Sequence, residues 1–279
     1  MLPFDFDYYL PKNLQEAVEL YRDLRQSGRQ PMYISGATEL ITLGRIDLVF
    51  TDAVIDIKNI PECREMGLDG DYLVLGSALT LTAIEEANLF PLLTKTSSEI
   101  ADHTARGKIT LGGNICGQIF YREAVLPFLL ADSQAVIIGP DGVKVHYIDE
   151  LFQNTLQLGN GEFLVQLATE KRFVDAPFIS IKRRQQWETG YPLITVAALK
   201  ISGEIRIAIS GLCPFPFRSN QMEAAINRDD LSVVNRVSAA LTVLPEPILN
   251  DIEGSADYRL FVLQNLLNDI LAELDGINA

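Results

Sequence analysis

The sequence is poor in the residues that bind metals and form disulfide frameworks. Among its 279 residues it has two histidines, His103 and His146, and three cysteines, Cys63, Cys116 and Cys213. The cysteines are odd in number and widely separated, so neither a disulfide framework nor a CxxC metal motif is present. A zinc or iron–sulfur centre built by this chain alone is therefore not expected.

Long apolar runs and positive charge are also scarce. No segment reaches the roughly 20 uninterrupted apolar residues of a membrane span, and the start MLPFDFDYYL lacks the basic region and apolar core of a signal peptide. The 23 lysines and arginines are outnumbered by 37 acidic residues, which gives a formal charge of −14. Because nucleic acid or an anionic membrane would call for a clustered basic face, the sequence predicts a cytoplasmic protein with neither partner.

Apolar periodicity predicts mixed helices and strands in the first 150 residues. Asn13 and Glu16 form a capping box before a helical pattern that Gly28 ends, and Thr82 with Glu85 forms a second capping-box candidate. Strands are expected at 32–35, 53–57 and 73–78, a helix at 124–131, and a hairpin at 135–145.

The last third of the chain has a different order of elements. Antiparallel strands are predicted within 162–181 and at 193–201 and 204–210, followed by helices at 231–241 and 258–274. Strands followed by helices predict an α+β C-terminal domain. We expect domains at 1–172, with subdomains of about 1–58 and 59–172, and at 173–279.

Two segments far apart in the sequence are rich in small residues. The first, Tyr33-Ile34-Ser35-Gly36-Ala37-Thr38-Glu39-Leu40, is an apolar strand that enters a turn and then a helix start. The second, Thr110-Leu111-Gly112-Gly113-Asn114, is entered through Thr104-Ala105-Arg106-Gly107-Lys108. Both suit a backbone that comes close to a phosphate-rich ligand, so together they predict two walls of one dinucleotide site.

Each segment also has a purely structural interpretation. Residues 35–38 can be a tight turn in which Thr38 caps a helix, and residues 110–114 can be a chain reversal with an Asx turn at Asn114. A full G-x-G-x-x-G is absent, so an ordinary Rossmann fingerprint is not supported. Arg106 and Lys108 can offset the charge of a ligand or can be solvated surface cations.

Other polar clusters give no catalytic assignment. Lys182-Arg183-Arg184, followed by Trp187 and Tyr191, contacts a nucleotide or a partner subunit, or else is a solvated strand end. His103 and Asp102 are sequence neighbours that point in different directions, which argues against an acid–base pair. No nucleophile elbow, metal triad or Walker loop is present, so we predict no catalytic side chain and no metal site. The chain suits cofactor binding better than acid–base chemistry.

Six segments in order along the chain carry a family resemblance: Pro11–Ala17, Ser35–Leu40, Leu73–Thr80, Arg106–Asn114, Gly211–Arg218 and Gly254–Arg259. Together they resemble the FAD-binding subunit of molybdenum hydroxylases, the group of xanthine dehydrogenase and carbon monoxide dehydrogenase. The match at Arg106–Asn114 is the most specific. The resemblance covers nearly the whole chain.

This resemblance implies a fold, a cofactor and a function. The fold is α+β, with a two-subdomain PCMH-type FAD-binding domain followed by an antiparallel sheet with helices. The subunit would be part of an oxidoreductase and pass electrons through FAD from a small 2Fe–2S subunit to NAD⁺ or oxygen. Substrate hydroxylation would take place on a molybdopterin-binding large subunit.

The resemblance also implies a set of FAD contacts. In that family the FAD diphosphate lies between the two loops. The cofactor-binding residues implied are Tyr33, Ile34, Ser35, Gly36, Ala37, Thr38, Glu39, Leu40, Thr110, Gly112, Gly113 and Asn114, together with Ile100, Glu123 and Arg218.

The chain departs from the family pattern directly after the second loop. Gln118-Ile119-Phe120-Tyr121-Arg122-Glu123 replaces small residues and a proline, and Glu39 replaces a commoner aspartate. Two alternative functions therefore stay open. One is a non-catalytic scaffold subunit that has lost FAD, and the other is a stand-alone flavin oxidase, against which the lack of a catalytic base near the loops counts.

Overall fold

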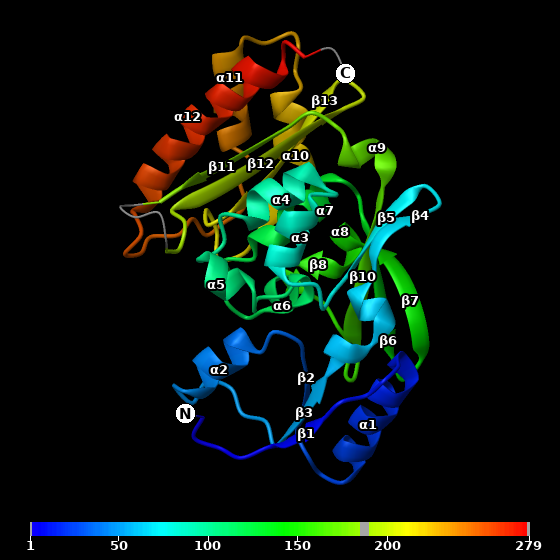
Figure 1. Cartoon of the computed structure of the whole chain (residues 1–279). Helices are drawn as coiled ribbons and strands as arrows, with labels where there is room; N and C mark the ends of the chain where they lie inside the picture. The colour runs from blue at the N-terminus through cyan, green and yellow to red at the C-terminus, as the bar shows by residue number, and fades with distance from the viewer. Residues whose placement is uncertain (1, 185–189, 278–279) are drawn as a thin grey trace. The chain divides into compact units, whose positions relative to one another are not determined.

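The computed structural model describes residues 2–184 and 190–277, which form two compact units (Figure 1). The first unit consists of Met1–Ala87, His103–Ile119 and Ser133–Thr169, and the second of Asn88–Asp102, Phe120–Asp132 and Glu170–Ala279. Each unit is thus assembled from three separate stretches of chain. The predicted domain boundary at residue 172 stays a prediction.

The first unit begins with a small parallel sheet in the order β1–β3–β2. The predicted first helix is confirmed: the Asn13 side chain accepts a hydrogen bond of 2.9 Å from the N–H of Glu16, and Gly28 follows the helix end with φ +83°. The elements are β1 (Asp7–Tyr9), α1 (Leu14–Gln26), β2 (Pro31–Ile34), α2 (Thr38–Gly44) and β3 (Ala53–Asp56).

A five-stranded sheet in the order β4–β5–β10–β6–β7 completes the first unit. The predicted hairpin is confirmed, because β6 and β7 pair antiparallel across Pro140-Asp141 and Gly142 has φ +97°. The strands are β4 (Met66–Asp69), β5 (Tyr72–Gly76), β6 (Gln134–Gly139), β7 (Gly142–Tyr147) and β10 (Phe163–Glu170), beside the short pair β8 (Phe152–Gln153) and β9 (Thr155–Leu156).

Short helices connect these strands. The capping box predicted at Thr82 was wrong: the helix begins at Leu81, and the side chain of Thr80 accepts the N–H of Ala83 at 3.2 Å. Thr82 therefore lies inside the first turn. The helices are η1 (Ile57–Asn59), η2 (Pro61–Arg64), α3 (Leu81–Ala87), α5 (His103–Arg106), α6 (Leu111–Cys116) and α8 (Ile148–Leu151).

One hydrophobic core joins the two sheets of the first unit. Ala17 and Val18 of α1 pack with Ile55 of β3, and Phe163 and Val165 of β10 belong to the same buried cluster. Because α1 has its apolar residues on one face, it covers this core and leaves its charged face to solvent. The core holds β3 and, through Tyr33, the end of β2, from which the first loop departs.

The second unit is built on an antiparallel sheet in the order β11–β12–β13–β14. The predicted strands and the two C-terminal helices are confirmed, whereas α10 was not predicted. The strands are β11 (Phe178–Arg183), β12 (Ile194–Ile201), β13 (Glu204–Ser210) and β14 (Phe217–Arg218). The helices are α4 (Pro91–Ser97), η3 (Glu123–Val125), α7 (Leu126–Leu130), α9 (Lys171–Val174), α10 (Asn220–Ile226), α11 (Val233–Leu241) and α12 (Ala256–Leu274).

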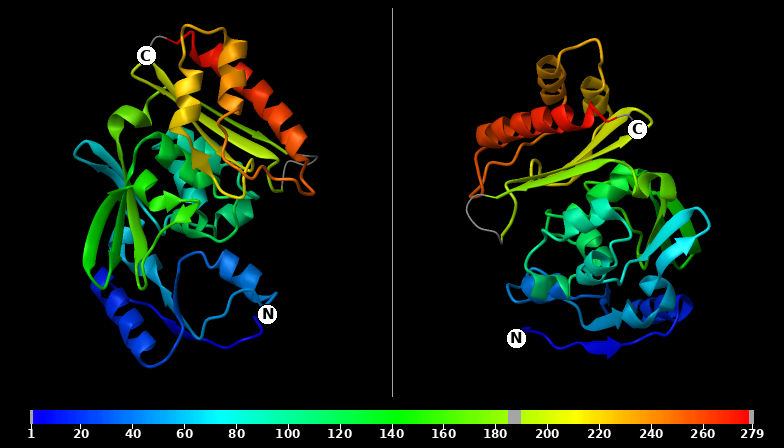
Figure 2. Two further views of the ribbon diagram at one scale, coloured as in Figure 1. Left: turned by 180° about the vertical axis from the view of Figure 1, so that it is seen from behind. Right: turned by 45° about the horizontal axis from the view of Figure 1, so that its top comes forward.

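Helices cover both faces of this sheet (Figure 2). The three C-terminal helices α10, α11 and α12 pack on one face through a buried cluster that includes Val196, Ile207, Met222, Val237 and Leu267. Helices α4 and α7 contact the strands from the other face. Strand β12 is buried at every position from 194 to 200 and is mostly apolar, which follows from this two-sided burial.

None of the helices in residues 2–184 and 190–277 is long and apolar enough to cross a membrane. The longest, α12, has 19 residues and includes the charged residues Asp257, Asp269 and Glu273. The cytoplasmic location stays a prediction.

A buried arginine ties the loops of the second unit together. The Arg259 side chain is fully buried, and its guanidinium donates to the Asp251 carboxylate at 2.5 Å and to the carbonyl oxygens of Leu193, Gly211 and Gly254. A planar guanidinium with five donors suits such a cluster of acceptors. Arg259 therefore fixes the start of β12, the end of β13 and the segment before α12 in one place.

We expect Arg259→Met to lower the free energy of unfolding by about 3 kcal/mol or more, since it leaves a carboxylate and several carbonyl oxygens without their donor. Chemical denaturation followed by circular dichroism measures this change. Arg228→Met is the control, because Arg228 makes an exposed ion pair with Asp230, and no measurable change is expected there. Equal stability of the two variants would contradict a clamping role for Arg259.

Candidate functional site

The two predicted loops meet backbone to backbone. A Cβ atom added to Gly36 would collide with the carbonyl oxygen of Lys108 and would lie 3.4 Å from the backbone N of Thr110. Only glycine allows such an approach. The structure therefore brings together the two segments that the sequence predicted as walls of one site.

The first loop presents unused backbone donors. Within the described residues, the N–H groups of Gly36, Ala37 and Thr38 have no hydrogen-bond acceptor. Ala37 has the left-handed conformation, with φ 55° and ψ 9°. Successive N–H groups around such a residue form a concave nest that binds anions. The hydroxyl of Ser35, buried and without a partner, adds a fourth polar group to this loop.

The second loop uses its donors within the protein. The N–H of Leu111 bonds to the carbonyl oxygen of Leu79 and that of Gly112 to Ser77, both at 2.8 Å, and the N–H of Gly113 bonds to the Thr110 hydroxyl at 3.2 Å. Thr110 is thus the N-cap of α6. A Cβ on Gly112 would lie 2.7 Å from the Cβ of Ser77, so this glycine allows close packing. In this loop the protein itself accepts the N–H groups of residues 111–113.

Glu39 links the first loop to the segment that follows α6 through its side chain. Its carboxylate accepts the N–H of Gln118 at 2.5 Å and that of Ile119 at 3.1 Å. It also lies close to Gly117, where a Cβ would be 2.7 Å from the carboxylate. Glu39 therefore anchors the start of the segment that departs from the family pattern.

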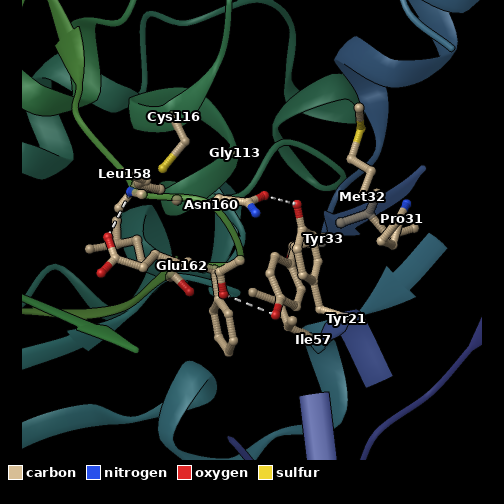
Figure 3. A pocket seen from close by; sticks show the side chains of 18 residues that line it. Tyr21, Pro31, Met32, Tyr33, Ile57, Gly113, Cys116, Leu158, Asn160 and Glu162 are labelled. Carbon is tan, nitrogen blue, oxygen red and sulfur yellow. Dashed lines mark hydrogen bonds between the residues drawn. The ribbon is translucent and has the colours of Figure 1, made fainter. Parts of the chain in front are cut away.

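A cavity of about 320 Å³ opens beside the two loops (Figure 3). Five of the predicted cofactor-binding residues line it: Tyr33, Ile34, Ser35, Gly112 and Gly113. The wall is completed by Cys116 of α6 and by the turn 158–162, which sequence analysis did not single out. The volume is at the lower end of the range for small-molecule pockets.

Two stacked tyrosines form the floor of this cavity. Tyr21 of α1 and Tyr33 of β2 have ring centroids 5.0 Å apart, and Tyr33 lies 4.5 Å from Phe163. The Tyr21 hydroxyl donates to Asn160 at 2.9 Å, and that of Tyr33 donates to the carbonyl oxygen of Gly161 at 3.2 Å (Figure 3). Burial raises the pKa of Tyr33. These bonds hold the 158–162 turn against the first loop.

The three cysteines differ in exposure. Cys63 and Cys213 are buried, and burial raises the pKa of each thiol to about 12. Cys116 is exposed and lines the cavity. A native-state thiol reagent therefore reports on the cavity wall through Cys116.

The two cations that sequence analysis named have different surroundings. Arg106 is buried and pairs with Glu85 at 3.0 Å, whereas the side chain of Lys108 is exposed. Lys58, which sequence analysis missed, donates to the carbonyl oxygen of Ser35 at 3.0 Å. No local pattern points to Lys58, because its relation to the first loop depends on the pairing of β2 with β3.

The predicted contacts Ile100, Glu123 and Arg218 belong to the second unit. Ile100 is buried. The Glu123 carboxylate is also buried and accepts hydrogen bonds from Lys182 at 2.8 Å and from the Thr195 hydroxyl at 2.7 Å. These partners account for the carboxylate without a cofactor, and its FAD contact stays a prediction.

Arg218 is held by partners within the second unit. It forms a bidentate pair with Glu223, at 2.8 and 3.0 Å, and donates to Asp132 at 2.6 Å and to the carbonyl oxygen of Leu129 at 2.9 Å. A basic contact to FAD would have to compete with these charge-assisted bonds. The contact predicted for Arg218 also stays a prediction.

The basic cluster at 182–184 is tied into the protein. Burial lowers the pKa of Lys182, and the nearby Glu123 carboxylate partly offsets this shift. The Lys182 ammonium also donates to the carbonyl oxygen of Glu99 at 2.7 Å. Arg184 donates to the same oxygen at 2.7 Å. Lys182 is therefore an internal cation at this strand end. Trp187 lies outside the described residues.

Comparison with protein families and curated sequences identifies relatives over most of the chain. Residues 4–168 match the family "FAD binding domain in molybdopterin dehydrogenase". The carbon monoxide dehydrogenase medium chain of Hydrogenophaga pseudoflava is 26% identical over 275 residues, 93% of each chain. The xanthine dehydrogenase FAD-binding subunit of Escherichia coli O157:H7 is 25% identical, over 97% of this chain and 96% of the relative.

Solved structures show the same fold. A chain of carbon monoxide dehydrogenase from Hydrogenophaga pseudoflava superposes with a TM-score of 0.86 at 24% identity, over 98% of both chains. A chain of quinoline 2-oxidoreductase from Pseudomonas putida 86 gives 0.82 at 22% identity, over 99% of this chain and 98% of the other. The predicted α+β fold is confirmed. With the matched residues covering more than half of its length, the chain belongs to the family of FAD-binding domains of molybdopterin dehydrogenases.

Proposed function

We propose that this chain is the electron-transfer subunit of a molybdenum-containing hydroxylase, working with a molybdopterin-binding large subunit and a small 2Fe–2S subunit. The bound flavin supplies the redox chemistry, the passage of electrons from the iron–sulfur partner to NAD⁺ or oxygen. The relatives support such an assembly, since they are described as a medium chain and as an FAD-binding subunit.

The observation that carries this proposal is the set of open donors on the first loop. The N–H groups of Gly36, Ala37 and Thr38 and the buried Ser35 hydroxyl fit the oxygens of a diphosphate, and the loop adjoins a cavity. Gly112 and Gly113, which line the same cavity, would form the opposite wall. The chain would thus bind FAD largely through backbone groups, which explains how an acidic protein can hold an anionic cofactor.

The position of Glu39 favours this function over a scaffold that has lost FAD. Its carboxylate binds the backbone of Gln118 and Ile119, so the bulkier segment after the second loop is anchored at its first residues. The replacement of aspartate by glutamate leaves the carboxylate in use. Both loops therefore keep a defined backbone.

We expect the complex, isolated through a tag on this chain, to contain molybdenum, iron and FAD. After anaerobic reduction with dithionite, the flavin absorption band should return when either NAD⁺ or oxygen is added. Stopped-flow absorbance measures the rate with each acceptor, and mass spectrometry identifies the subunits. The faster acceptor is the physiological candidate.

Two results would contradict the proposal. A complex that carries no flavin, and a chain that binds no added FAD, would support a scaffold. Turnover of a small substrate by the purified chain, without any partner, would indicate a stand-alone oxidase.

We expect Gly36→Ala to raise the dissociation constant for FAD at least about tenfold, because the added methyl group meets the backbone of Lys108 and pushes the loops apart. Quenching of flavin fluorescence measures the affinity. Gly67→Ala is the matched control, since a Cβ there meets no atom within 4 Å. If both variants bind FAD as the wild type does, the meeting of the loops is not part of the site.

We expect one of the three thiols, Cys116, to react quickly with a disulfide reagent at about pH 8 in the native protein, since the other two are buried. Added FAD should slow this reaction several-fold because Cys116 lines the cavity. Cys116→Ser removes the fast phase and serves as the control. An unchanged rate with saturating FAD would place the cofactor outside this cavity.

A further inference from the structure

Lys58 connects the small parallel sheet to the first loop. It lies in η1, two residues after the end of β3, where Asp56 is paired in register with Ile34 of β2. Its ammonium donates to the Asp56 carboxylate at 2.5 Å and to the carbonyl oxygen of Ser35 at 3.0 Å. Because the two strands are parallel, the residues that follow both strands emerge at the same edge of the sheet.

Asp56 holds the lysine in place. Its side chain is fully buried and accepts three hydrogen bonds: from the hydroxyl of Tyr8 at 2.5 Å, from the backbone N–H of Lys58 at 3.0 Å and from the Lys58 ammonium. Tyr8 belongs to β1 and Asp56 to β3, so two strands of the small sheet hold the lysine. The hydrogen bond to Asp56 and burial raise the pKa of Tyr8 to about 12, so the phenol stays a donor at neutral pH.

Lys58 binds the peptide group between Ser35 and Gly36, whose N–H is the first open donor of the loop. The carbonyl oxygen of Ser35 and the N–H of Gly36 belong to the same planar, trans peptide group, and they point in opposite directions. A hydrogen bond to the oxygen therefore fixes the direction of the Gly36 N–H. It also polarises the peptide, which strengthens that N–H as a donor.

We propose that Lys58 is a positioning residue of the FAD site, which acts through the Ser35–Gly36 peptide to aim the first-loop N–H groups at the diphosphate. The inference rests on the proposed function, which assigns this loop to FAD. Asp56 and Tyr8 fix the ammonium, the ammonium fixes the peptide, and the peptide presents its donor on the opposite side. Lys58 thus contributes to binding without touching the phosphates.

The test is the affinity of the full chain for FAD, measured by quenching of flavin fluorescence. Lys58→Met should raise the dissociation constant about tenfold or more, the effect expected for losing one hydrogen bond from a charged donor. Lys58→Arg keeps charge and donors and should stay within about twofold of the wild type. Lys12→Met changes the net charge equally at an exposed position and should not alter the affinity.

Hydrogen exchange separates positioning from a general loss of structure. In the chain saturated with FAD, where the diphosphate would accept these N–H groups, Lys58→Met should speed exchange at residues 36–38 and leave residues 111–114 unchanged. The melting temperature should fall modestly, because the buried Asp56 carboxylate loses one partner and keeps Tyr8 and the Lys58 N–H. If Lys58→Met does not fold, Tyr8→Phe weakens the same anchor from an exposed side chain, and a two- to threefold rise in the dissociation constant is expected, at about the strength of one neutral hydrogen bond.

The results distinguish failure of the Lys58 inference from failure of the proposed function. A wild-type affinity in Lys58→Met, or an equal loss in Lys12→Met, overturns the role of Lys58 and leaves the proposed function standing. A wild-type chain that binds no FAD overturns the proposed site and this inference together. A loss in Lys58→Met that Lys58→Arg restores, with faster exchange confined to 36–38, supports the inference.

Discussion

The candidate site depends on the contact between two backbone segments at Gly36 and Lys108. No side chain fits between the loops at this point, so the spacing of the site is set by main-chain atoms. Such a contact is rigid, because it has no rotamers to change. The cavity and the hydrogen bonds of Glu39 to Gln118 and Ile119 lie beside this contact.

The two loops have different roles. The first loop keeps the N–H groups of Gly36, Ala37 and Thr38 free because the left-handed Ala37 turns the chain before α2 begins. The second loop has the more distinctive sequence, yet its N–H groups at 111–113 bond to Leu79, Ser77 and Thr110. It is the wall against which the first loop is held. A glycine-rich motif can thus serve packing rather than donation.

In this protein of net charge −14, several basic side chains are held inside the fold. Arg106, Lys182, Arg218 and Arg259 are all held by internal carboxylates or carbonyl oxygens, so the basic residues that look available in the sequence serve the fold. Desolvated cations need such partners. In the proposed site a diphosphate would be bound mainly by backbone dipoles, one of which Lys58 would strengthen.

The sequence by itself determined the local elements and the two loops. Asn13 with Glu16 predicted α1, Pro140-Asp141-Gly142 predicted a hairpin, and the small residues of both loops predicted their meeting, because caps, turns and close approaches depend on residue types at fixed spacing. The tertiary structure alone decided which N–H groups stay free, that Glu39 binds Gln118 and Ile119, and that Lys58 reaches Ser35. Those contacts join residues 23 to 80 positions apart. Strand pairing and packing, which no local pattern encodes, bring such residues together.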